Sequence, residues 1–539
     1  MSKQKISLDS FALLNSNVFV RTYFPFIFFL FGTCYFNLRI LGPGLKYIPG
    51  DLGDSRFINY LLEHGYQFLS GHLHSFWNGN FMYPYKPVIA LSDNMLGTLP
   101  VYAALRGLGW NSQTSFQLWW VIISALNYWS CFVVLKKWMG NYILAVCGAF
   151  IFAYGLFNLS QLNYMQMVSR FMVPPVLFAA YKLVTEPKLK YLAIYCFGLL
   201  FQFYCVMYLG FLLLYFSLLF ILLLAVFNRS VSFLFFYLNR KNVAFSLAMA
   251  VACALLLYVL VWPYFITSKE TGFRLYKEVV PNLPAFYSYF FSNEASVPWH
   301  FLSLKGKLIF KEWWLQDIFP GMLVYAGFAL SFLATIKGFV QKRKMPVLFS
   351  ALFVCSLALF FLFTRTENNL TFYGLLIKLP GMNSLRVLTR FMHVQLFFLI
   401  VLGISAVVEL EYNKKIKTML LICLPFLVIL DNLFDQTKIP RTEKSALIAR
   451  VESLKTKILR EDFQKYKAVV YLPMGKDPVF VSQLDMMIAA QGLGIQTVNG
   501  YSSSCPPAFG DFFLMENQKG LDKWLLKENV TPGDVLILR

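Results

Sequence analysis

Long apolar runs alternate with short basic loops along most of the chain. A helix needs roughly 20 apolar residues to cross a hydrocarbon core about 30 Å thick, and about eleven runs approach that length. The pattern therefore predicts a polytopic α-helical membrane protein of about 11 spans. The predicted spans are residues 18–41, 114–135, 142–157, 171–183, 191–207, 209–227, 243–261, 318–336, 347–363, 391–408 and 419–433.

The basic loops indicate the orientation of these spans. Lysine and arginine concentrate in the short loops, for example at Lys136 and Lys137, and cytoplasmic loops carry such an excess. Together with Lys3 and Lys5 before the first span, this pattern predicts a cytoplasmic N-terminus and an extracytoplasmic C-terminus. Two long loops, residues 42–112 and 262–316, then face the outer side.

One apolar segment does not fit as a span. Residues 95–108 are apolar enough for a short helix. A full span there would move Lys136 and Lys137 to the outer side, against the basic-loop bias. We therefore predict a re-entrant or interface-lying helix that closes the first outer loop.

The composition becomes that of a soluble protein after Asp431. Helical and strand-like patterns then alternate, which is typical of a small α/β unit. We predict a transmembrane module over residues 1–437 and a C-terminal α/β domain over 438–539, on the outer face. Its predicted helices are 445–459 and 481–490, and its strands are 468–472, 495–498 and 535–538.

Composition supports this class and removes others. Hydrophobic residues make up 58% and charged residues 14% of the chain, against about 45–50% and about 25% in soluble domains. The net charge of +21 lies mainly in the loops between apolar runs, so it indicates topology and not nucleic-acid binding. Of nine cysteines only Cys505 lies in a polar region, so neither a disulfide framework nor a CxxC metal signature is predicted.

The first outer loop opens with the sequence GDLGDSR at residues 50–56, directly after the first span. Charges at a membrane edge are costly unless they are hydrated, paired or used. Asp51 and Asp54 are three residues apart, so they face the same way on a helical turn. We predict that they form an acidic catalytic centre with Arg56 nearby as a substrate ligand. For Asp54, a helix N-cap is the alternative.

Cationic and polar residues on the outer side are candidate substrate ligands. Arg386 and Arg390 are four apart with no acid between them, which is unfavourable on one helix face unless an anion binds there. Paired guanidinium groups suit phosphate oxygens, with lipid headgroups as the alternative partner. Arg274, Gln166 and Asp93 complete the candidates; Arg274 has a solvated surface as its alternative, and Asp93 a cap of the 95–108 helix.

The histidines are weak evidence for a metal site. All five fall on the outer side or at its edge, and His72 and His74 could present two imidazoles on one side of an extended segment. Two histidines alone fix neither a metal nor a geometry. No cofactor is certain from the sequence, and a divalent metal stays an open alternative.

Taken together, these features resemble the GT-C class of lipid-linked-sugar glycosyltransferases, and more narrowly the large bacterial multispan proteins in or near that class. A first span, an early Gly-Asp with a second acid, and a long outer loop carry the resemblance. The similar segments are Gly50 to Asp54, Tyr83-Pro84, Ser92-Asp93-Asn94, Ile318 to Gly321, Leu385-Arg386 with Arg390, Leu472-Pro473, and Asn499 to Ser502.

The resemblance implies a glycosyltransferase of the bacterial inner membrane that takes a sugar from a polyprenyl-phosphate donor to an extracytoplasmic glycan, lipid or protein acceptor. Asp51 would be the base, Asp54 the second acid, and Arg386 or Arg390 the phosphate ligand. The chain departs from members with a second Asp-Asp or Glu-x-Asp motif, because Asp93 stands alone. This departure leaves metal dependence open.

Two other functions are compatible with the sequence. A lipid or glycan flippase or transporter would carry ionisable residues in mid-span, and the predicted spans are nearly free of them. A non-catalytic envelope-assembly protein would instead use the C-terminal domain to bind a partner. Neither a Walker loop nor a dinucleotide fingerprint competes with these readings.

Overall fold

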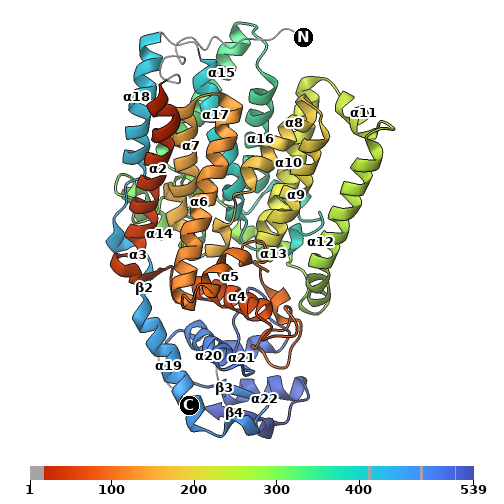
Figure 1. Ribbon diagram of the computed structural model, residues 1–539, viewed down its shortest axis with the longest axis vertical. Coiled ribbons are helices and arrows are strands. Elements are labelled where there is room, and N and C mark those ends of the chain that lie inside the picture. The colour runs from red at the N-terminus through yellow and green to blue at the C-terminus, as the bar shows by residue number, and fades with distance from the viewer. Residues whose placement is uncertain (1–16, 411–413, 474–476, 516) are drawn as a thin grey trace.

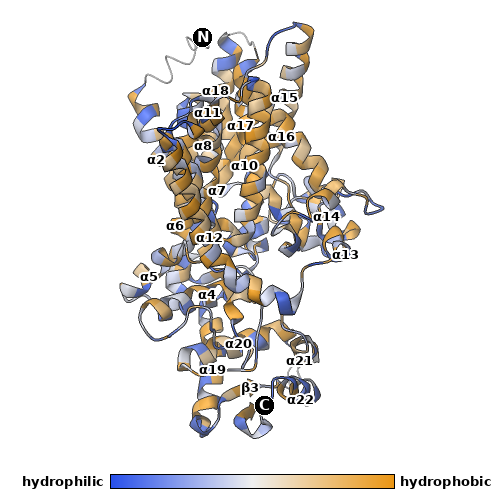
Figure 2. Ribbon diagram, turned by 90° about the vertical axis from the view of Figure 1, so that its right-hand side faces the viewer, coloured by the Kyte–Doolittle hydropathy of each residue, from blue (hydrophilic) through white to orange (hydrophobic). Residues whose placement is uncertain are grey.

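The computed structural model describes residues 17–410, 414–473, 477–515 and 517–539. A tall helix bundle occupies the upper part of the molecule, and the C-terminal residues form a smaller unit below it (Figure 1). Hydrophobic residues dominate the upper part, whereas the lower part is mixed (Figure 2). Lys3 and Lys5, on which the predicted orientation partly rests, lie outside the described residues.

Helices occupy every predicted span. The first is a continuous run of η1 (Phe19–Tyr23), α2 (Phe24–Gly32), η2 (Thr33–Leu38) and α3 (Arg39–Leu41). The others are α6 (Ser112–Met139), α7 (Tyr142–Tyr154), α8 (Val173–Thr185), α9 (Leu189–Cys205), α10 (Met207–Asn228), α12 (Val243–Thr271), α15 (Met322–Val340), α16 (Val347–Phe363), α17 (Met392–Glu409) and α18 (Lys414–Asp431).

Seven helices among the described residues are long and apolar enough to cross a membrane. They are the segments Phe19–Leu45, Ser112–Met139, Tyr142–Gln161, Met207–Asn228, Val243–Thr271, Met322–Val340 and Leu388–Glu409. Helices α8, α9 and α16 are apolar but shorter. The count of eleven spans therefore stays a prediction, while the polytopic helical class is confirmed.

The buried fraction of the helices decreases from the centre of the bundle to its edge. The segments that contain α7 and α17 are 94% and 89% buried, whereas α12 is 11% buried and stands at the edge in Figure 1. A helix that is apolar all round belongs in such a centre. Helices α15 and α17 cross at Gly327 and Gly403, where a Cβ on either residue would lie 3.0–3.1 Å from the other's Cα. Small residues allow this close approach of two helices.

The first long loop forms a layer between the bundle and the C-terminal unit. It contains α4 (Asp54–Leu69) and α5 (Leu99–Gly107), which pack on each other. With nine residues, α5 is too short to cross a membrane. Helix α12 runs to Thr271, so the predicted second outer loop, 262–316, starts inside a helix. The remaining helices of the bundle region are α11 (Ser232–Leu238), α13 (Tyr276–Val279) and α14 (His300–Ile309).

The C-terminal unit contains α19 (Lys444–Arg460), α20 (Val479–Leu493), α21 (Phe509–Met515) and α22 (Gln518–Lys527). Strands β3 (Ala468–Tyr471) and β4 (Val535–Leu538) pair in parallel, and Thr497 adds one bridge to β3. The strand predicted at 495–498 is therefore reduced to that bridge. Strand β2 (Arg441–Glu443) pairs antiparallel with β1 (Tyr47–Pro49), which joins the unit to the start of the first loop.

Candidate functional site

Asp51 lies in a tight turn between β1 and α4. Gly50 has a φ of +89°, and a Cβ there would lie 2.7 Å from the Leu162 carbonyl oxygen, so only glycine fits this turn. The Asp51 N–H donates to Asn163 Oδ1 (3.0 Å), and Asp51 Oδ1 accepts from the Gly53 N–H (2.9 Å). The side chain stays open to solvent. Partial desolvation raises the pKa of Asp51, and the neighbouring Asp54 raises it further.

Asp54 lies beside Asp51 but has a different partner. It is the first residue of α4, so the predicted helix start at Asp54 is confirmed, although the N-cap itself is Gly53. Its carboxylate accepts a short hydrogen bond from the hydroxyl of Tyr501 in the C-terminal unit. Burial raises the pKa of Tyr501, and the charges of Asp54 and Asp51 raise it further. The two acids and this phenol therefore form one cluster.

Arg390 lies in the turn Leu388–Phe391, directly before α17. Its guanidinium lies over the rings of Tyr164 (4.7 Å) and Tyr208 (5.1 Å), and its buried Nε has no hydrogen-bond partner among the described residues. Asp93 lies nearby: desolvation raises its pKa to about 6, against the attraction of Arg390. Asp93 Oδ1 accepts from the Met207 N–H (3.1 Å). Arg390 thus keeps donor capacity that no described protein group uses.

Asp93 does not cap the helix after it. The N-cap of α5 is Thr98, without a side-chain cap bond, and Asn94 Oδ1 takes the local backbone N–H of Leu96 (3.0 Å). The capping alternative for Asp93 is therefore wrong. The carboxylate is directed to the first residues of α10 instead, on the side where Arg390 lies.

Tyr164 connects the acids with the arginine. Burial raises the pKa of Tyr164, the charges of Asp54, Asp317 and Asp51 raise it further, and that of Arg390 opposes the rise. Tyr164 therefore lies within electrostatic reach of four titratable side chains, which come from three separate segments of the sequence. The Arg390 guanidinium lies over this ring (4.7 Å), and Asp51 is hydrogen-bonded through its N–H to Asn163, the residue before Tyr164.

Sequence reasoning missed Asp317. Its side chain is 5% exposed and accepts from Asn293 Nδ2 (3.2 Å). Burial raises the pKa of Asp317 to about 8, although hydrogen bonds from Ser160 and Asn293 oppose the rise. Asp317 directly precedes a predicted span, so its position in the sequence gives no sign that it comes near Tyr164. Tyr164 carries no sequence signal either, whereas Tyr501 lies in the segment Asn499 to Ser502 that supports the resemblance, although no role was predicted for its side chain.

Arg386 and Arg390 do not share a helix face. Arg386 is exposed in the irregular segment after Met382–Ser384, and Arg390 lies in the 3-10 turn Leu388–Phe391. The i,i+4 argument is therefore wrong. Tyr208 still brings them to one place, because its hydroxyl donates to the carbonyl of the intervening Val387 (2.5 Å).

Arg274 reaches the same region from the second long loop. Its N–H donates to the Asn383 carbonyl (3.0 Å), and its Nη2 donates to the Ser503 carbonyl (2.8 Å) and to Ser504 Oγ (3.1 Å). Burial lowers the pKa of Arg274, and repulsion from Arg386 lowers it further. Arg274 and Arg386 therefore form a cationic pair next to the C-terminal unit.

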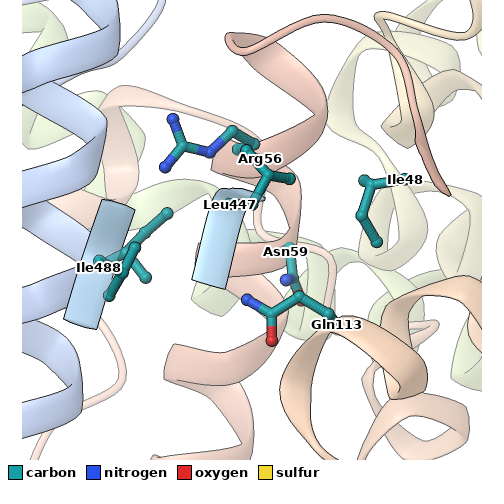
Figure 3. A pocket seen from close by; sticks show the side chains of 7 residues that line it. Ile48, Arg56, Asn59, Gln113, Leu447 and Ile488 are labelled. Atoms are coloured by element: carbon teal, nitrogen blue, oxygen red, sulfur yellow. The ribbon is translucent and has the colours of Figure 1, made fainter. Parts of the chain in front are cut away.

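Arg56 points away from the acids. It is 4% exposed and forms an ion pair with Asp485 of α20. It lines a small cavity, about 20 Å³, with Asn59, Gln113 and Leu447. Figure 3 shows its side chain extending toward the helix that carries Ile488. Substrate binding by Arg56 stays a prediction.

Gln166 also stays a prediction. It lies in the turn Met165–Val168 and is buried. Its Oε1 has no hydrogen-bond partner among the described residues. A buried amide oxygen without a donor carries a free-energy cost that a bound hydroxyl or N–H group would relieve.

A metal site is not evident from the side chains. No group of three or more His, Cys, Asp or Glu within residues 17–410, 414–473, 477–515 and 517–539 is arranged to hold an ion. His72 and His74 are exposed, and His72 Nδ1 lies 3.0 Å from Ser70 Oγ. The divalent metal that the sequence leaves as an alternative has no assigned ligands.

Comparison with known proteins gives a match at the level of structure. No family model matches the chain, and no curated protein matches its sequence. The apo crystal structure of the oligosaccharyltransferase of Archaeoglobus fulgidus aligns over 95% of this chain and 70% of its own, with a TM-score of 0.50 and 12% identity.

A second structure agrees with the first. It is archaeal oligosaccharyltransferase AglB from A. fulgidus in complex with an inhibitory peptide and a dolichol-phosphate, with a TM-score of 0.50, 13% identity, and coverage of 95% of this chain and 69% of that chain. At such identities the likeness establishes the fold alone. The predicted resemblance is confirmed at that level: the chain shares the fold of these archaeal oligosaccharyltransferase structures, which are of the GT-C class.

Proposed function

We propose that the protein is a membrane glycosyltransferase that moves a sugar from a polyprenyl-phosphate donor to an extracytoplasmic acceptor. The observation that carries the proposal is that Arg390 lies over the ring of Tyr164 (4.7 Å), while Asp51 is hydrogen-bonded to the preceding residue, Asn163 (3.0 Å). The fold adds support, because one of the structures that share it is described in complex with a peptide and a dolichol-phosphate. In this proposal the C-terminal unit lies outside a bacterial cytoplasmic membrane.

The chemistry requires a base and an anion ligand. The acceptor group attacks the anomeric carbon from the face opposite the phosphate, the glycosidic C–O bond breaks, and configuration inverts. Asp51 takes the proton of the acceptor; a raised pKa suits a general base, because it lies closer to the working pH. The leaving phosphate departs as an anion and needs no strong acid.

The cationic side chains suit the phosphate. Arg390 has an unsatisfied buried Nε and is held by two aromatic rings, and Arg386 and Arg274 lie beyond it. Guanidinium groups donate in pairs to phosphate oxygens. Asp93 lies near Arg390 and offsets part of the positive charge of Arg390 while no anion is bound. Metal dependence is left open, and no step of this reaction needs one.

Transfer by purified protein in nanodiscs, with a polyprenyl-phosphate sugar, tests the proposal. Asp51→Asn should lower the transfer rate about 10²–10⁴-fold, the usual contribution of a general base. Arg386→Ala should raise the apparent KM for the donor. The control is Asp522→Asn, an exposed acid on α22. Wild-type transfer by a folded Asp51→Asn protein would remove Asp51 as the base, and an unchanged donor KM would remove Arg386.

A further inference from the structure

Helix α14 presents large apolar side chains to the outside. Phe301, Leu304 and Leu308 follow one another at i, i+3 and i+7, so they form one stripe. All three are exposed, as is Ile309, and Leu308 is exposed to 89%. Such a contiguous apolar stripe is unusual on a surface that faces water.

The opposite face of α14 packs on the protein through small residues. Ser303 and Gly306 are buried there. A Cβ on Gly306 would lie 2.2 Å from the ring of Phe291, so the helix lies directly on that ring. The helix therefore has the reverse of the polarity expected for a helix on a water-soluble surface, with its small side chains inside and its large apolar ones outside.

Hydrogen bonds fix the start of α14 at the ends of two long helices. Trp299 Nε1 donates to Asp431 Oδ1 (2.9 Å) at the end of α18, and the same oxygen accepts from the Met322 N–H (3.0 Å) at the start of α15. The Val297 N–H donates to the Leu433 carbonyl (2.9 Å). These contacts place α14 at the level where the bundle ends, on the side of the C-terminal unit.

The figures agree with this position. In both views α14 lies above α4 and α5, at about the height of the α6 label, and in Figure 2 it projects to one side of the bundle. Side chains at the ends of the two helices that hold the start of α14, Leu430 of α18 and Met322 of α15, are likewise apolar and exposed. The stripe of α14 therefore extends the apolar surface that surrounds the bundle.

The polar residues near α14 suit a membrane interface. Lys305 and Lys311 are exposed, and Trp314 is exposed just beyond the helix. Tryptophan and lysine are typical of the headgroup level, and lysines near that level attract anionic lipids. Lys307 instead pairs with Glu294 and lies over the ring of Trp313 (4.7 Å), so it belongs to the packed side.

We propose that α14 is an interfacial helix that lies in the membrane leaflet on the side of the C-terminal unit. Phe301, Leu304 and Leu308 enter the upper acyl region, and Lys305 and Lys311 contact anionic headgroups. The occupant of this surface is lipid, because the stripe continues the apolar belt of the bundle and is flanked by interface residues. A partner protein that bound this stripe would have to displace the lipid from it.

If α14 lies in the membrane interface, it fixes the position of the second long loop. Arg274 lies near the start of this loop and is bonded to Asn383 and Ser503, and Asp317, which directly follows the loop, lies near Tyr164. α14 lies between them and would hold the middle of the loop at the lipid surface. This consequence rests on the proposed function, whereas the membrane position of α14 does not.

Photo-crosslinking of the full-length protein tests the position of α14. p-Benzoylphenylalanine replaces Leu308 in one variant and Leu526 of α22 in the matched control, which is 79% exposed in the C-terminal unit. Both proteins are placed in nanodiscs of phosphatidylethanolamine and phosphatidylglycerol, irradiated, and analysed by mass spectrometry. We expect a several-fold higher yield of lipid adducts at position 308 than at 526.

A second measurement, fluorescence quenching, tests the position of α14 without using transfer activity or crosslinking chemistry. A fluorescent amino acid at Leu304 should be quenched more by lipids spin-labelled near the headgroup than by lipids labelled near the bilayer centre. Equal lipid-adduct yields at 308 and 526, or adducts at 308 with a protein chain alone, would overturn the proposal. Loss of transfer by Asp51→Asn tests the function separately and leaves this result unaffected.

Discussion

The ion pair between Arg56 and Asp485 connects α4 with α20, and its replacement discriminates between two roles of Arg56. Arg56 is 4% exposed and Asp485 is 5% exposed. Asp485 has a second cation, because Arg450 donates from Nε to Oδ2 (2.9 Å) and its Nη2 lies 2.7 Å from the same oxygen. Arg450 itself is 34% exposed and also pairs with Asp477 (2.7 Å). The two partners are therefore not equivalent.

Removing each partner leaves a different charge behind. Asp485→Asn leaves Arg56 buried without a counter-charge, and an orphaned buried ion costs about 3–5 kcal/mol. Arg56→Met leaves Asp485 paired with Arg450, so the loss is mainly that of charged hydrogen bonds, about 1.5–3 kcal/mol. We therefore expect Asp485→Asn to destabilise the junction of α4 and α20 more than Arg56→Met does.

Hydrogen exchange of the α20 amides measures this loss locally, and thermal unfolding in detergent measures it globally. Glu452→Gln, which alters an exposed pair on α19, is the control and should leave both readings unchanged. The donor KM is measured for each variant. A loss for Arg56→Met as large as that for Asp485→Asn would refute the reasoning. A raised donor KM without loss of protection would instead support Arg56 as a substrate ligand.

Two further predictions concern side chains that sequence reasoning missed. Tyr501→Phe removes the hydroxyl that donates to Asp54, and a hydrogen bond to a charged group contributes about 1.5–3 kcal/mol. We therefore expect faster proteolysis within residues 499–505 of the variant. A proteolysis rate equal to that of the wild type would contradict a role for this bond. Asp317 has a folded pKa raised to about 8 from 3.8, so the folded state binds its proton more tightly and stability falls as pH rises toward about 8. Asp317→Asn should remove that fall from thermal unfolding profiles, and an equal fall in the variant would show that another group titrates.

The helices of the bundle could be predicted because their signal is local. A run of apolar residues long enough to cross a bilayer is visible in a single window, and α6, α10 and α12 are of this kind. The C-terminal unit was harder. β3 and α20 carried their own periodicity, whereas the single bridge at Thr497 depends on pairing with β3. Helices α21 and α22, over 509–527, were missed.

Only part of the candidate site could be predicted, because most of its contacts join segments that are distant in sequence. Asp51 and Asp54 are close in sequence, so spacing alone brought them together. The approach of Asp93 to Arg390, and of Tyr501 to Asp54, joins segments that are hundreds of residues apart and depends on tertiary packing. The i,i+4 argument for Arg386 failed because the chain before α17 is irregular up to the turn at Leu388.

The difference between the two acids follows from their neighbours. Asp54 stands in the first turn of α4, where the helix dipole favours an anion, and it accepts from the Tyr501 hydroxyl. Asp51 precedes the helix, stays open to solvent, and has a raised pKa because of desolvation and the nearby charge of Asp54. The Asp51 side chain is exposed and accepts from the Gly53 N–H of its own turn, whereas Asp54 is half-buried and accepts from the Tyr501 hydroxyl of the C-terminal unit. A base must be both accessible and basic enough, so the geometry favours Asp51 as the base and Asp54 as the fixed charge that tunes it.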